Sequence, residues 1–89
     1  MSVEETLEQR GSIYGDYEEG TKTRGWIMET LREHKRRCSG SGFTPAEEVM
    51  ITDLVNKLVR FAGSPTHIDS IHDLAGYATL IERTLTCQK

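Results

Sequence analysis

Apolar residues recur at helical spacing in three stretches of the chain, and no stretch of useful length alternates with the period of two that is typical of a strand. The broadest stripe belongs to a predicted helix over 45–62. It comprises Val49, Met50, Leu54, Leu58 and Phe61, with Ile51, Val55, Val59 and Ala62 alongside. A stripe of this width is typical of a helix that is buried on two sides. The sequence therefore predicts an all-α protein with this helix in its core.

Local signals fix both ends of the helix over 45–62. Thr44 is a favourable N-cap, Pro45 suits the first helical position, and Glu47 stands three residues after the cap, which completes a capping box. Gly63 and Pro65 end the segment.

A second long helix is predicted over 69–86, where the apolar face comprises Ile71, Leu74, Ala75, Ala78, Ile81 and Leu85. A short turn separates it from the helix over 45–62, so the two form an antiparallel hairpin. Gly76 lies in the middle of this helix, where glycine is about 1 kcal/mol less favourable than alanine. We therefore expect another helix to approach closely at Gly76.

The remaining segments complete one small helical bundle over 1–89. A further helix is predicted over 21–38, and its start is either Tyr17 or Thr21. One face of this helix carries Trp26, Ile27, Leu31 and His34. A Gly/Ser connection follows over 39–43. Residues 1–20 are expected to form a short helix and a glycine-punctuated loop. Since the helix over 45–62 has more apolar surface than a monomer of this size covers, we expect a homodimer.

Composition excludes membrane proteins, secreted disulfide-rich proteins and collagen-like proteins. Of the 89 residues, 36% are hydrophobic and 28% are charged, as in ordinary soluble proteins. No apolar run approaches the roughly 20 residues of a membrane span, and no signal peptide is recognisable, so a cytoplasmic protein is expected. Cys38 and Cys87 lack metal-site spacing; they are interpreted as reduced thiols, with a redox or intersubunit bridge as the alternative.

Positive charge is concentrated at the end of the helix over 21–38. The cluster comprises Arg32, Lys35, Arg36 and Arg37, although the net charge of the chain is −3. One interpretation is a partner-binding surface, to which Trp26 would contribute. The other is a solvated helix end whose basic side chains the helix dipole favours. The acidic overall balance argues against a nucleic-acid binder.

Carboxylates provide the candidate chemistry. Asp69 and Asp73 are four residues apart and share one helix face. With Asp53 they could hold magnesium, and Glu47 and Glu48 are further candidates; a site between two chains is also open. The alternative is that these side chains cap helices or face solvent. Lys57 and Arg60 face Asp69 and Asp73 across the predicted turn, where pairing of Arg60 with Asp69 or Asp73 would tie the hairpin together.

The sequence resembles a family of short phage and prophage proteins of unassigned function. The resemblance rests on Arg10, on Tyr14-Gly15-Asp16-Tyr17, on the helix with Met50, Lys57 and Arg60, and on His67 to Ala78. That family looks distantly like the all-α nucleoside-triphosphate pyrophosphatases of the MazG and dimeric dUTPase type, which hold magnesium with acidic helix pairs. A third carboxylate of that pattern is missing, because this chain has Ile51 there.

Two functions follow from these observations. The resemblance implies a phage-type helical protein, in the host cytoplasm, that binds or hydrolyses a nucleotide with magnesium held by Asp53, Asp69 and Asp73. It also implies that Lys57 and Arg60 bind the phosphates of that nucleotide. The alternative is a non-catalytic interaction module that modulates a host or phage protein. No catalytic nucleophile motif is recognisable in the sequence.

Overall fold

The computed structural model describes residues 17–87 of the chain, and these residues form three helices without a strand. Helix α2 spans Tyr17–Ser39, α3 spans Pro45–Gly63 and α4 spans Ile68–Cys87. The all-α prediction is confirmed. Residues 1–16, which hold most of the predicted N-terminal helix and loop, lie outside the described residues. Helix α2 begins at Tyr17, the earlier of its two expected starts.

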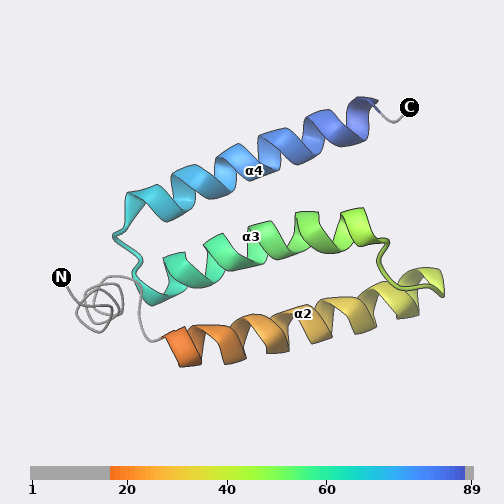
Figure 1. Cartoon of the computed structure of the whole chain (residues 1–89), viewed down its shortest axis with the longest axis horizontal. Coiled ribbons are helices and arrows are strands. Elements are labelled where there is room, and N and C mark those ends of the chain that lie inside the picture. Colours follow the sequence, from red (N-terminus) through yellow and green to blue (C-terminus); the bar gives the residue numbers. More distant parts are fainter. Residues whose placement is uncertain (1–16, 88–89) are drawn as a thin grey trace, which may run out of the picture.

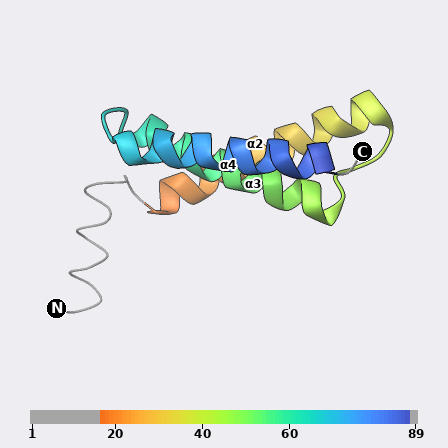
Figure 2. The same cartoon turned by 90° about the horizontal axis from the view of Figure 1, so that it is seen from above.

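Helix α3 lies between α2 and α4, and it packs against both (Figure 1). Seen from above, the three helices overlap as members of one layer (Figure 2). The predicted hairpin of the last two helices is confirmed, with residues 64–67 as the turn. The expectation that the central helix is covered on two sides is also confirmed, because one side of α3 contacts α2 and the other contacts α4.

The ends of α3 follow the sequence signals. The Thr44 amide donates to Glu47 Oε1 at 2.8 Å, and the Glu47 amide donates to Thr44 Oγ1 at 3.2 Å, so the capping box is present. At the other end, the Ser64 amide donates to the Arg60 carbonyl at 3.1 Å. Helix α2 ends differently: Gly40 has φ +75, in the left-handed region, and its amide donates to the Arg36 carbonyl at 2.7 Å.

Little of the layer is buried. Among the described residues, one residue in each helix is buried: Met28 in α2, Val55 in α3 and Ser70 in α4. Met28 meets α3 at Thr52, whose hydroxyl donates to Met28 Sδ at 3.9 Å. These contacts place the core along the two seams that α3 shares with its neighbours. Within residues 17–87, no helix combines the length and apolar character needed to cross a bilayer.

The packing reason predicted for Gly76 is wrong within the chain. No atom of a side chain or of another described element lies within 4 Å of the position that a Cβ atom would take. Gly76 is exposed, so the hairpin closes without a close helix approach at this position.

Candidate functional site

Opposite charges meet where α3 and α4 face one another. Lys57 Nζ lies 2.9 Å from Asp73 Oδ2, and the Lys57 side chain is only 14% exposed against 46% for Asp73. The hydrogen bond from Lys57 lowers the pKa of Asp73, and the positive charges of Lys57, His72 and Arg60 lower it further. An ion pair therefore ties the hairpin together, as expected, although the pairing predicted from the sequence was that of Arg60 with Asp69 or Asp73. Lys57 makes the bond to Asp73, and Arg60 acts on the same carboxylate through its charge.

The lowered pKa of Asp73 makes the hairpin sensitive to acid. A carboxyl whose pKa is depressed in the folded state stabilises the fold above its ordinary pKa of 3.8, and this contribution is lost as pH falls through the lower folded value. We expect Asp73→Asn to lower the melting temperature slightly at pH 7 and to leave it unchanged at pH 2. Melts of wild type and variant from pH 7 to pH 2 measure this. An equal difference at both ends would contradict a role for this charge.

Two of the acidic residues considered for magnesium, Glu47 and Glu48, have partners within the chain. The Thr44 backbone amide lowers the pKa of Glu47 by donating to its carboxylate, and Glu48 forms an ion pair with Arg32 of α2. Among residues 17–87, no three His, Cys, Asp or Glu side chains gather as metal ligands would. Asp53, Asp69 and Asp73 therefore do not gather as such a group within one described chain, and a magnesium site on them stays a prediction.

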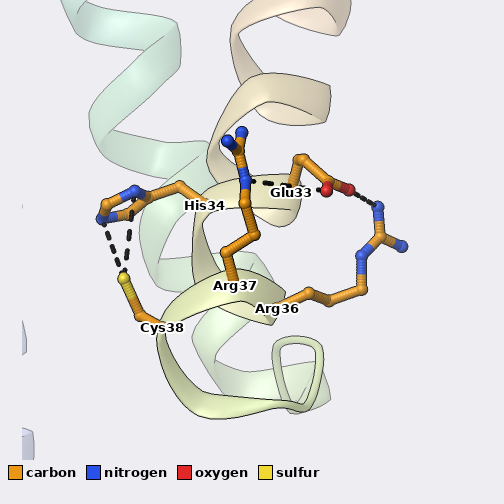
Figure 3. Close-up of polar contacts among 5 residues, drawn as sticks. All are labelled: Glu33, His34, Arg36, Arg37 and Cys38. Carbon is orange, nitrogen blue, oxygen red and sulfur yellow. Dashed lines mark hydrogen bonds and ion pairs between the residues drawn. The ribbon is translucent and has the colours of Figure 1, made fainter.

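The basic end of α2 is partly neutralised within its own helix. Figure 3 shows the Glu33 carboxylate facing the guanidinium groups of Arg36 and Arg37, with 3.6 Å between Arg37 Nε and Glu33 Oε1. The hydrogen bond from Arg36 lowers the pKa of Glu33. Lys35 Nζ donates to Ser39 Oγ at 2.7 Å. With Arg32 held by Glu48, the cluster predicted as a partner-binding surface is in contact with nearby polar groups of its own chain.

His34 and Cys38 form a contact that the sequence analysis missed. The Cys38 sulfur lies 3.5 Å from His34 Nε2, and the two side chains reach toward each other on the opposite side of α2 from Glu33 (Figure 3). Residues four apart in a helix are neighbours on its surface, so the spacing of His34 and Cys38 was the sequence signal for this contact. Cys38 and Cys87 are both free and exposed, so they do not bridge each other within the chain.

Large apolar side chains remain exposed on one side of the hairpin. Leu58 lies about 100° around α3 from Lys57, and Ile71 lies about 200° around α4 from Asp73, so neither shares the side of its helix that carries the Lys57–Asp73 pair. Ile71, Ala78 and Leu85 follow one another at spacings of seven along α4. We call Leu58, Ile71, Ala78 and Leu85 the apolar face of the hairpin. The exposed fractions of its large side chains are 50% for Leu58, 43% for Ile71 and 52% for Leu85.

Comparison with known proteins identifies a phage relative. The chain is 34% identical over 88 residues to the Gene 55 protein of Mycobacterium phage L5, and the match covers 93% of this chain. It covers 52% of the relative, so the chain spans about half the length of the curated protein that it matches. No family model and no solved structure matches the chain. The likeness to a phage protein agrees with the resemblance seen in the sequence, and it does not extend to the MazG-type pyrophosphatases.

Proposed function

We propose that this chain is a non-catalytic, phage-type interaction module that binds a partner protein through the apolar face of the hairpin. The observation that carries the proposal is the exposure of Leu58, Ile71 and Leu85 on one side of a folded helix pair. Contiguous exposed apolar surface on a small protein is typical of a protein–protein contact. The likeness to a phage protein supports the phage part of the proposal.

The shape of the face favours a helical partner. Its apolar side chains come from two antiparallel helices, α3 and α4, which lie side by side and pack against each other (Figure 1). An amphipathic helix can pack its apolar side against two such helices, with anchors at three- and four-residue spacing. The partner's contact segment is therefore expected to be a helix with one apolar stripe.

Replacing Leu58 and Ile71 together by lysine is expected to abolish partner binding while the chain stays folded. Both side chains are about half exposed, so charge at these positions is compatible with the fold but not with an apolar contact. The immobilised chain is used to capture a partner from a lysate of infected cells, and the affinity is then measured with the two purified proteins. We expect the double variant to bind at least tenfold more weakly.

The matched control replaces Val49 and Ile68, which are 61% and 77% exposed on the same two helices, by lysine. This control should bind the partner as wild type does. Equal binding by the Leu58/Ile71 variant, or equal losses in both variants, would contradict the proposal.

Nucleotide binding is the second candidate function. It is favoured by Lys57 and Arg60, two cations that both act on the Asp73 carboxylate and could meet a phosphate in the same place. Calorimetric titration with several nucleoside triphosphates and magnesium at millimolar concentration separates the candidates. We expect no heat of binding; saturable heat that is lost in Lys57→Ala would favour nucleotide binding instead.

A further inference from the structure

We infer that α4 carries a second contact surface, on the side opposite the apolar face of the hairpin, and that it binds the same surface of a second copy of this chain in antiparallel orientation. We call this surface the α4 stripe and define it by Asp69, Asp73, Gly76, Leu80 and Arg83. These residues recur at spacings of three and four, so they share one side of the helix.

The α4 stripe contains an open groove. His72, Asp73, Gly76, Tyr77 and Leu80 line it. Four of these stand at i, i+3, i+4 and i+7, which is the set of positions that forms a hole for a side chain of a neighbouring helix. Gly76 keeps the middle of the groove open, because no side chain lies within 4 Å of its missing Cβ.

Leu80 is the side chain that fits this groove. It is an apolar residue with 55% of its surface exposed, and it stands at the edge of the groove itself. When two α4 helices lie antiparallel, Leu80 of each copy can enter the groove over Gly76 of the other. Two-fold symmetry makes this contact twice, which is the usual arrangement of a homodimer.

The charges of the α4 stripe complement each other in the same register. Asp69 and Asp73 stand toward its N-terminal end and Arg83 toward its C-terminal end. With Leu80 over Gly76 of the second copy, Arg83 lies level with Asp73 of that copy and one turn from Asp69. Within residues 17–87 neither Asp69 nor Arg83 makes an ion pair, so both charges are available to the second copy. A parallel pair would bring like charges together.

This surface also gives Gly76 a role. A glycine inside an exposed helix is less favourable than alanine, and no contact within the described chain compensates for it. Close approach of a second α4 would compensate. We therefore assign the contact surface of the homodimer expected from the sequence to α4 rather than to the broad apolar stripe of the helix over 45–62.

Filling the groove tests the inference. By light scattering, wild type at about 100 µM should have a mass of about 20 kDa, twice the 10.1 kDa of one chain. Gly76→Leu should stay helical, since its side chain enters open space, but should dissociate at least tenfold more readily. Gly25→Leu is the matched control, because Gly25 in α2 also has nothing within 4 Å of a Cβ. It should dimerise as wild type does.

Reversing one charge gives an independent readout. Arg83→Glu should weaken the dimer at low salt, and the difference from wild type should shrink as salt screens the repulsion. Arg37→Glu, an equal reversal on α2, should leave the dimer unchanged. A 10 kDa species for wild type at 100 µM, or wild-type affinity in Gly76→Leu, would overturn the inference. The Leu58/Ile71 lysine variant should still dimerise, so failure of the proposed function is distinguishable from failure of this interface.

Discussion

Replacing Val55 by aspartate is expected to abolish cooperative folding. Val55 is 5% exposed and belongs to α3, the helix on which both neighbours pack. A carboxylate there would be buried without a partner, at a free-energy cost of several kcal/mol. Domains in general unfold at about 5–15 kcal/mol, and one this small is at the lower end. Circular dichroism should show the loss of the thermal unfolding transition.

Val49→Asp is the control for this substitution. Val49 lies on the same helix but is 61% exposed, so its carboxylate stays in water and the melting temperature should hardly change. A cooperative transition in Val55→Asp near the wild-type temperature would show that α3 is not the centre of the layer.

Met28→Ala is expected to lower the free energy of unfolding by about 2–5 kcal/mol, the usual range for truncating a buried methionine. Met28 is the buried residue of α2, 5% exposed, and its sulfur meets Thr52 of α3. The cavity would lie in the seam between these two helices, so the variant should expose α2 first. Urea unfolding gives the change in free energy, and hydrogen exchange shows which helix loses protection.

Trp26→Ala provides the comparison on the same helix. Trp26 is larger than Met28, but it is 75% exposed and should change the free energy of unfolding by no more than about 0.5 kcal/mol. A greater loss in Trp26→Ala than in Met28→Ala would contradict the way α2 is seated on α3.

Much of the fold was predictable because its signals are local. The Thr44 cap, the helical spacing along both long helices and the short turn between them specify a hairpin without reference to distant residues. The charge tie across that hairpin was also predictable, since Lys57 and Asp73 flank the turn at similar distances. The pairing predicted was that of Arg60, because spacing alone does not show that Lys57 makes the bond to Asp73.

The exposed fraction of each apolar side chain could not be predicted from the sequence. Val49 and Leu58 belong to the same predicted stripe as Val55, yet they are 61% and 50% exposed. A helix that lies between two neighbours in one layer has two covered sides and two open ones, and periodicity does not distinguish this from a helix surrounded by a bundle. The same ambiguity led to the mistaken packing role for Gly76.

Side-chain accessibility of the purified chain tests most directly whether the apolar face of the hairpin is open for a partner. Hydroxyl-radical footprinting measures how fast each side chain is modified. When only leucines are compared, differences in intrinsic reactivity between residue types do not enter. We expect Leu58 and Leu85, about half exposed, to be modified faster than the less exposed Leu54 and Leu74. Protection of Leu58 and Leu85 to the level of Leu54 and Leu74 in the free chain would show that this face is already covered, and would contradict its role in binding a partner.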